Sequence, residues 1–377
     1  MKQRSAIIIG AGIVGLATAR ALASRGWQVR IFERNETAIG ASIRNFGMIW
    51  PIGQATGPMY DRAMLSRRIW KDICTEAKIW HNESGSLHLA YHQDEMQVLE
   101  EYAQENGTRR DCSVLTANQA MQKSDAINPA NLIGGLWSGE EMIIESRVAV
   151  QQVAAYLQQK YGIEFHFNTA IARVEGNCVF SGKNSWQADE VFICSGADFE
   201  TLYPEIFKET QITKCKLQMM RLVGQPDQWR IGPSLCGGLS LIHYPGFKSA
   251  PTLPALRERY EQQYVEYLKW GIHVMVSQNG EGELTVGDSH EYGLTHDPFD
   301  KAFIYEMILS YLKTFTRFKD DTVLQTWQGI YPKMTNGEAS FITEPESKVT
   351  VINGLGGNGM TLSFGLCEQY IQQKFDS

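Results

Sequence analysis

The stretch that most constrains the fold is the first 33 residues, where a glycine-rich turn separates two apolar runs. Residues 6–9 are apolar, and Gly10, Gly12 and Gly15 follow at once. A stretch rich in alanine and leucine then leads to a second apolar run at 29–32. This order predicts a strand, a tight turn, a helix and a second strand. A lone glycine motif would be weak evidence, but here spacing and context agree.

The same unit predicts a dinucleotide site. Gly10 allows the sharp turn, Gly12 lets a pyrophosphate approach the backbone, and Gly15 allows close packing of helix and sheet. The helix start offers free N–H groups and the positive end of its dipole. Glu33 ends the second strand, where it can accept a hydrogen bond from a ribose 2′-OH. A carboxylate there would repel a 2′-phosphate, which argues against NADP. An ordinary strand–helix–strand unit with incidental glycines is the less favoured alternative.

A second glycine loop follows a strand near the other end of the chain. Residues 349–352 are apolar or β-branched, residues 353–361 read NGLGGNGMT, and a helix is expected up to Gln373. A third apolar strand, at 190–194, ends on the small residues Ser195 and Gly196, which can lie beside the first loop. A simple NAD enzyme has little use for a second loop of this kind. A longer cofactor, whose redox ring lies far from its adenine, would use such a second loop.

Composition excludes several classes of protein. The 377 residues carry a net charge of −7, so general binding to nucleic acid or anionic membranes is not expected. The seven cysteines show no paired spacing, which predicts neither a disulfide framework nor a metal site, and free thiols suit a reducing cytoplasm. The glycine turn begins so near Met1 that we expect no signal peptide. No apolar run approaches the ~20 residues of a membrane span.

Between the two glycine loops, apolar periodicity predicts further elements. Helices are expected at 61–77, 94–106, 146–161, 257–268 and 303–315, and strands at 80–90, 214–222, 271–277 and 283–286. Residues 34–60 read as an ordered loop against a ligand, and 326–340 as a turn-rich stretch. We expect a discontinuous nucleotide-binding domain of residues 1–80, 145–213 and 325–377. Residues 81–144 and 214–324 would form a substrate domain.

Four stretches together resemble one family over nearly the whole chain. GAGIVGLATARALASRG with Glu33, VFICSGA, GDSHEYG and GLGGNGMTLSFG are similar to motifs of the D-amino-acid oxidase-like FAD-dependent oxidoreductases. This family includes glycine oxidase, sarcosine oxidase and D-amino-acid dehydrogenase. The resemblance implies an α/β fold: a Rossmann-like FAD-binding domain of the GR2 type, with a second α+β domain built on a mixed or antiparallel sheet.

The resemblance also implies which residues bind FAD. The glycines and Glu33 would hold its ADP half, Ile171 would meet the adenine, and the C-terminal loop would wrap the pyrimidine end of the flavin. The full expected set is Gly10, Gly12, Ile13, Val14, Gly15, Glu33, Arg34, Ala41, Ser42, Asn45, Phe46, Gly47, Met48, Ile171, Ser195, Gly196, Gly356, Gly357, Asn358, Gly359, Met360 and Thr361. Some relatives attach FAD through a cysteine where this chain has Tyr331, so we expect non-covalent FAD.

The sequence departs from the family pattern at the substrate site. Members that oxidise amino acids commonly carry Gly-x-Arg-Pro, whose arginine holds the substrate carboxylate with a bidentate fork. Here the stretch reads Gly329-Ile-Tyr331-Pro-Lys333, with a phenol in place of the fork and an ammonium two residues later. RNFGMIWP and GDSHEYG look like a branch associated with aminophosphonate breakdown. The resemblance therefore favours 2-aminoethylphosphonate or its N-methyl form over glycine, sarcosine or a D-amino acid.

The expected reaction is hydride transfer from the amine-bearing carbon to flavin N5, followed by imine hydrolysis. Candidate catalytic residues are His273, Tyr331, Lys333 and Arg44, with His243 and His290 as further substrate contacts. For Asp288, capping a turn and contacting the substrate are equally expected roles. Oxygen, or a quinone or carrier, would reoxidise the flavin. The alternative from another class is a non-catalytic FAD-binding or electron-transfer protein, although no cysteine cluster is present for an iron–sulfur partner.

Overall fold

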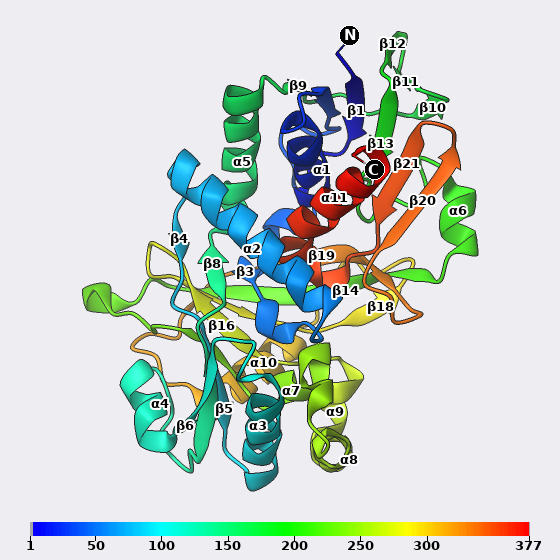
Figure 1. Cartoon of the computed structure of the whole chain (residues 1–377). Coiled ribbons are helices and arrows are strands. Elements are labelled where there is room, and N and C mark those ends of the chain that lie inside the picture. Colours follow the sequence, from blue (N-terminus) through cyan, green and yellow to red (C-terminus); the bar gives the residue numbers. More distant parts are fainter. Residues whose placement is uncertain (1–2, 377) are drawn as a thin grey trace.

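The computed structural model describes residues 3–376 and is built around two large sheets (Figure 1). The first has six strands in the order β20-β21-β13-β1-β2-β9. All neighbours in it run parallel except β20 and β21. Its strands are β1 (Ser5–Ile9), β2 (Gln28–Phe32), β9 (Glu164–His166), β13 (Glu190–Ile193), β20 (Phe341–Glu346) and β21 (Val349–Asn353).

This strand order brings three distant loops to one edge. β13 pairs with β1 on one side and with β21 on the other, both in parallel. The loops after these strands therefore meet at the carboxyl edge of the sheet, where ligands bind in sheets of this type. The predicted pairing of the Ser195–Gly196 turn with the first glycine loop is confirmed, since Cys194 N–H donates to the carbonyl of Ile9 at 2.9 Å.

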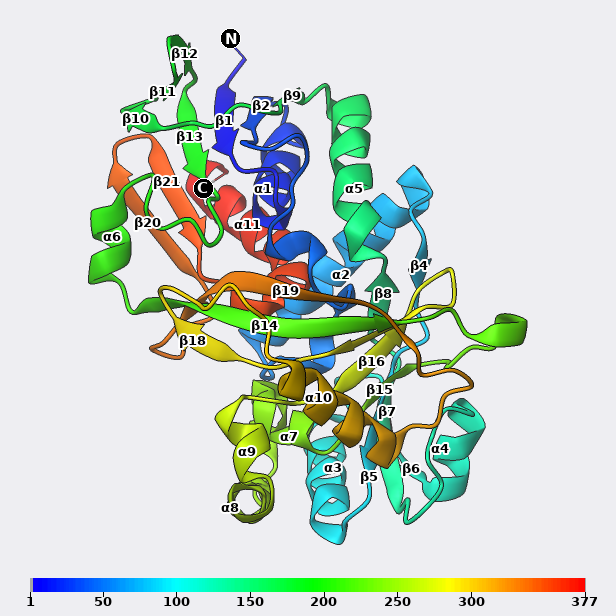
Figure 2. The same ribbon diagram turned by 180° about the vertical axis from the view of Figure 1, so that it is seen from behind.

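Helices cover one face of the first sheet and a small sheet covers the other (Figures 1 and 2). The helices are α1 (Ile13–Ala23), α2 (Pro58–Ala77), α5 (Ser146–Tyr161) and α11 (Gly359–Phe375), and their apolar sides share one core with Ala6, Ile8 and Ile31. The small sheet is β10 (Arg173–Glu175), β11 (Cys178–Ser181) and β12 (Asn184–Gln187). It packs with Ile7, Ile9 and Phe32, so β1 sends alternate side chains to opposite faces.

The second large sheet has nine strands, in the order β18-β14-β17-β16-β15-β5-β7-β6, with β19 along the other edge of β14. All pairs are antiparallel except β15 with β5. The strands are β5 (Ser86–Ala90), β6 (Cys112–Thr116), β7 (Gly134–Ser138), β14 (Ile212–Leu222), β15 (Ser234–Cys236), β16 (Met275–Gln278), β17 (Leu284–Gly287), β18 (Glu291–Gly293) and β19 (Val323–Met334).

One face of this second sheet is covered by helices and the other faces the first sheet (Figure 2). The helices are α3 (Gln93–Asn106), α4 (Ala117–Lys123), α7 (Leu239–His243), α8 (Leu253–Gln263), α9 (Val265–Lys269) and α10 (Ala302–Phe315). Residues from most of them share an apolar core with the sheet. A further helix, α6 (Pro204–Glu209), precedes β14, and three short strands, β3 (Met48–Ile49), β4 (His81–Asn82) and β8 (Met142–Ile144), form a bridging sheet.

Two sequence expectations were wrong in detail. The predicted turn-rich stretch 326–340 contains most of β19, which pairs with β14 over its whole length. The predicted strand 80–90 is two strands in different sheets, β4 and β5. The chain turns between them at Gly85, whose φ of 77° is unfavourable for other residues. The division into two domains stays a prediction, and β19 belongs to the second sheet although the expected boundary groups it with the first.

Within the described residues, no helix combines the length and the apolarity that crossing a membrane requires.

Candidate functional site

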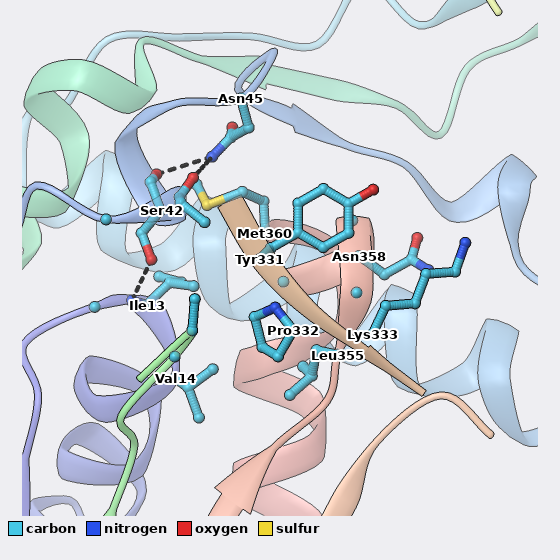
Figure 3. A pocket seen from close by; sticks show the side chains of 18 of the residues that line it. Ile13, Val14, Ser42, Asn45, Tyr331, Pro332, Lys333, Leu355, Asn358 and Met360 are labelled. Atoms are coloured by element: carbon cyan, nitrogen blue, oxygen red, sulfur yellow. Dashed lines mark hydrogen bonds between the residues drawn. The ribbon is translucent and has the colours of Figure 1, made fainter. Parts of the chain in front are cut away.

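A single elongated cavity of about 780 Å³ extends from the carboxyl edge of the first sheet to the facing surface of the second. Figure 3 shows the part where both glycine loops approach β19. Most residues expected from the sequence line this cavity. They are Gly10, Gly12, Ile13, Val14, Glu33, Arg34, Ala41, Ser42, Arg44, Asn45, Phe46, Met48, Ile171, Ser195, Gly196, His273, Tyr331, Lys333, Gly356, Gly357, Asn358, Gly359, Met360 and Thr361.

Two of the expected cofactor residues, Gly15 and Gly47, do not line the cavity but shape its walls. A Cβ on Gly15 would lie 1.9 Å from the carbonyl oxygen of Gly10, so only glycine lets α1 pack this close to the turn. A Cβ on Gly47 would lie 1.9 Å from the carbonyl oxygen of Ile144, and its φ is 73°. Both glycines are therefore required by backbone packing.

The N-terminal loop presents a helix start to the cavity. Helix α1 has Gly12 as its N-cap residue, with no side-chain cap and no acidic residue in its first turn. Ile13 N–H donates to Ser42 Oγ at 3.0 Å, a bond drawn in Figure 3. This bond joins the first glycine loop to the loop that follows β2. Gly12, Ile13 and Val14 line the cavity, so the start of α1 lies beside it, as an anion site requires.

Glu33 is held at the end of β2 by three hydrogen bonds. Its Oε2 accepts from Ala11 N–H at 3.0 Å, and its Oε1 accepts from the backbone and side-chain nitrogens of Asn35 at 3.1 and 3.2 Å. The side chain is 8% exposed and lines the cavity. A carboxylate fixed in this way has lone pairs left for a ribose hydroxyl. Arg34, beside it, pairs with Asp198.

Asn45 fixes the shape of the loop between the two sheets. Its Nδ2 donates to the carbonyls of Ala41 at 3.0 Å and Ser42 at 2.9 Å, and its Oδ1 accepts from Gly47 N–H at 2.8 Å. The first two bonds are visible in Figure 3. Asn45 thus organises the wall of the cavity through the backbone of its own loop.

The C-terminal loop forms a second helix start at the same cavity. Gly354 and Gly356 have φ values of 78° and 60°, and α11 begins after Asn358 without a side-chain cap or an acidic residue in its first turn. Thr361 Oγ1 accepts from Trp50 N–H at 2.9 Å, and Asn353 Nδ2 donates to the carbonyl of Gly196 at 3.0 Å. These bonds tie the C-terminal loop to the other two loops at this edge.

The residues present fit FAD. Two helices of 11 and 17 residues begin at one cavity, without a cap from the N-cap side chain and without an acidic residue in the first turn. The indole N–H of Trp50, which lines the cavity, is buried and has no hydrogen-bond partner among the described residues. FAD is long, with a pyrophosphate for one helix start and a ring that becomes anionic on reduction for the other. Non-covalent attachment of FAD stays a prediction from the absence of a cysteine in residues 329–332.

Strand β19 supplies the expected substrate residues on the far side of the cavity. Tyr331 is 6% exposed and lies beside the C-terminal loop, close to Asn358, as Figure 3 shows. Lys333 Nζ donates to the hydroxyl of Tyr292 at 3.0 Å. Arg44 reaches the same strand, where its Nη1 donates to the carbonyl of Gln328 at 3.2 Å. Arg44 therefore braces the loop against β19 while it lines the cavity.

Three histidines and an aspartate converge on the substrate side. The ring of His243 lies 3.7 Å from that of His273 and 4.9 Å from that of His290, centroid to centroid. Asp288 approaches the Nε2 atoms of His273 at 3.2 Å and His290 at 3.8 Å. All four residues line the cavity. The sequence named them one by one, but no spacing predicted that 243, 273 and 290 would meet, because α7 and the ends of β16 and β17 bring them together.

Burial of this cluster disfavours the charged form of its titratable groups. It lowers the pKa of His243 and His273 well below the usual value and that of His290 to about 4. It also raises the pKa of Asp288 well above the usual value. One nitrogen of each histidine lies within 4.8 Å of the others, but the rings of His243 and His273 lie against each other, 3.7 Å apart and tilted by 32°, rather than spread around a central point. We therefore assign no metal here.

Some cavity residues were missed by the sequence analysis. Trp50, Gln54, Leu217 and Met219 all line the cavity. The alternation of β14 could have revealed Leu217 and Met219, since they share a face with Cys215 and pack with Tyr331. Gln54 carried no local signal, because its role depends on a contact with Asn358 (3.0 Å) 304 residues away.

Glu33→Gln should weaken FAD binding by tenfold or more, because hydrogen bonds to a charged acceptor contribute about 1.5–3 kcal/mol. The substitution keeps the size of the side chain but turns one acceptor oxygen into a donor facing Ala11 or Asn35. Equilibrium titration of the apoprotein with FAD, followed by flavin fluorescence, measures the effect.

The matched control is Glu36→Gln, three residues further on and exposed. It should leave the affinity for FAD unchanged. Equal affinities of the two variants would show that the Glu33 carboxylate does not contact the cofactor.

Comparison with known proteins agrees with this site. Residues 5–373 match the model of the DAO family, described as FAD dependent oxidoreductase. One of the subunits of the opine oxidase of Rhizobium meliloti is 20% identical over 88% of this chain and 82% of its own. The crystal structure of glycine oxidase from Bacillus cereus superposes with a TM-score of 0.77 at 18% identity, covering 98% of this chain and 94% of that one.

L-proline dehydrogenase from P. horikoshii superposes equally well, with a TM-score of 0.77 at 19% identity over 99% of this chain and 94% of its own. These similarities to solved structures establish the fold, and the family model covers nearly every residue. The chain belongs to the DAO family of FAD-dependent oxidoreductases.

Proposed function

We propose that this enzyme oxidises a small primary or secondary amine that carries an anionic group, and that the favoured substrate is 2-aminoethylphosphonate or its N-methyl form. The observation that carries the proposal is the wall of the cavity formed by Lys333, Tyr331 and the three histidines. This wall offers donors from several directions, and it replaces the planar arginine fork that suits a carboxylate.

The shape of the donor set favours a tetrahedral anion. A phosphonate presents three oxygens that diverge, whereas a carboxylate presents two in one plane. Lys333 supplies a point charge from β19, and His243 reaches the cavity from α7. The neutral imidazole of His243 donates one N–H, so together with Lys333 and the hydroxyl of Tyr331 it can meet oxygens on different sides of one anion.

The chain's own residues position the substrate and exclude water. FAD, when bound, supplies the hydride acceptor for the carbon next to nitrogen. Met48 and Trp50 from the loop side, and Leu217 and Met219 from β14, form apolar walls of the cavity. A dry, fixed site aligns the C–H bond and strengthens every polar contact to the anion. Oxygen, or a quinone or carrier, then accepts the electrons.

A carboxylate-bearing amine is the second candidate. The named relatives act on glycine, L-proline and opines, according to their descriptions, and each of the first two is an amine with a carboxylate. Tyr331 and Lys333 could bind a carboxylate as well, with less geometric selectivity than an arginine. The two candidates differ in the anion alone, which makes a direct comparison decisive.

Anaerobic mixing with a panel of amines should separate the two substrate classes. We expect 2-aminoethylphosphonate or its N-methyl form to bleach the flavin band faster than glycine, sarcosine or D-alanine, measured as the second-order rate of reduction in a stopped-flow instrument. Faster reduction by the carboxylates would assign the enzyme to the second candidate. No reduction by any amine would favour a scaffold or electron-transfer protein.

Lys333→Ala should raise the Kd of the best substrate by about tenfold or more, because it removes the charge that faces the anion. The limiting rate of flavin reduction should change less than the Kd. The matched control is Lys183→Ala, on the exposed β11–β12 turn, which should leave both constants unchanged. An unchanged Kd in Lys333→Ala would show that this ammonium does not hold the anion.

A further inference from the structure

The cluster around Asp288 contains buried polar atoms that the protein itself does not satisfy. Asp288 is 5% exposed and His273 is 3% exposed. Within the described residues, neither Asp288 Oδ1 nor His273 Nδ1 has a hydrogen-bond partner, although Asp288 Oδ1 lies 3.2 Å from His273 Nε2. Leaving such atoms unpaired costs about 1–3 kcal/mol each. Unpaired buried groups that line a cavity point to a role toward a ligand.

His290 is oriented by the backbone in a way that leaves one nitrogen free. Its Nδ1 lies 2.8 Å from the carbonyl oxygen of Gly271, and this distance assigns the proton of the neutral ring to Nδ1. Its Nε2 then carries a lone pair and lies 3.8 Å from Asp288 Oδ2. A lone pair facing a carboxylate is unfavourable unless a proton lies between them. The geometry is therefore suited to receiving one.

Several titratable groups of the described residues face the cluster, and the strong cation among them is Lys333. The positive charge of Lys333, on β19, lowers the pKa of Asp288 and of all three histidines. Burial raises the pKa of Tyr244, Tyr331 and Tyr292, so these phenols stay un-ionised. Cys215, behind Tyr331, has a pKa raised to about 12 by burial. Arg257, on α8 and outside the cluster, also lowers the pKa of His243 through its positive charge.

The proposed reaction requires a proton acceptor. A small primary amine is an ammonium at neutral pH, since its pKa is near 10, and an ammonium has no lone pair to stabilise the carbon that loses hydride. The substrate must therefore release a proton first. Burial raises the pKa of Asp288, which makes its carboxylate a stronger base than an exposed one.

We propose that Asp288 is the general base that takes the proton of the substrate ammonium, with His273 and His290, whose Nε2 atoms lie 3.2 and 3.8 Å from its carboxylate oxygens, as the residues that position it. This inference rests on the proposed amine oxidation. The substrate carries an anion at one end and an ammonium at the other. In this proposal Lys333 binds the anion and Asp288 binds the ammonium, at two ends of the same cavity wall.

The proton transfer precedes the oxidation. One N–H bond of the ammonium breaks, its electron pair stays on nitrogen, and the proton forms an O–H bond on the Asp288 carboxylate. The free amine then loses hydride, with both electrons, from the adjacent carbon to the oxidised flavin, and becomes an iminium. Water adds to the iminium to give an aldehyde and an ammonium. FAD is the oxidant.

Asp288→Asn tests the proposal through the pH dependence of flavin reduction. The substrate is the amine of the panel that reduces the wild-type enzyme fastest. Flavin reduction is measured anaerobically from about pH 6 up to the pKa of that amine, near 10. In the wild type, the second-order rate of reduction should level off at a pH well below the pKa of the amine. In Asp288→Asn it should keep rising about tenfold for each pH unit. Two units below the pKa of the amine, the variant should therefore be about hundredfold slower.

A binding measurement separates the loss of the base from damage to the fold. Propylphosphonate carries a methyl group in place of the ammonium of 2-aminoethylphosphonate, so its perturbation of the flavin spectrum reports anion binding alone. Its Kd should be unchanged in Asp288→Asn. His273→Asn is a second variant, which should steepen the pH profile in the same direction. Asp227→Asn, an exposed aspartate in η3 (Pro226–Gln228), is the matched control and should follow the wild type.

A pH profile in Asp288→Asn and His273→Asn that levels off as in the wild type would overturn the assignment of the base and leave amine oxidation standing. A wild-type enzyme that no amine reduces would overturn both.

Discussion

The parallel pairing of β13 with β1 and β21 is the constraint that sets the position of every other part of the site. These strands are separated by more than 150 residues on either side, yet their carboxyl ends lie next to each other. Burial on both faces fixes the register, because a shift by one residue would turn Ile7 and Ile8 to the wrong cores. The loops that follow these strands must therefore open into the same space, and two helix starts lie at one cavity.

The second sheet completes the site from the opposite side. Its long pair β14 and β19 carries Cys215, Leu217, Met219 and Tyr331 on the face toward the first sheet, packed with Ala41 and Phe46 of the connecting loop. The antiparallel register places Cys215 opposite Tyr331 and Thr213 opposite Lys333. Strand pairing thus sets the position of the proposed substrate wall relative to the glycine loops, and Phe46 of the connecting loop packs against this part of the second sheet.

The parts of the site that depend on local geometry could be predicted from the sequence. Gly10, Gly12 and Glu33 indicate a dinucleotide site because a turn, a close approach and a strand end have fixed spacings. β19 was read as turns because Gly329, Pro332 and the Asn336-Gly337 pair are turn residues. It forms a strand at the edge of the sheet, a position that tolerates the missing N–H of Pro332. Gly329 fits because Arg44 and Leu217 approach its backbone closely. The histidine cluster could not be predicted, because its members come from three elements whose meeting is a property of the whole sheet.

Our central proposal is that the two terminal loops of the chain hold one non-covalent FAD between them. Denaturing the purified, yellow protein with acid and measuring the flavin in the supernatant is the decisive test of this arrangement. We expect acid to release all of the flavin, one FAD per chain. When FAD is added to the stripped and refolded protein, we expect it to bind again and to restore the visible absorption spectrum. Flavin that stays attached to the precipitated chain, or a protein that is colourless and takes up no FAD, would refute it.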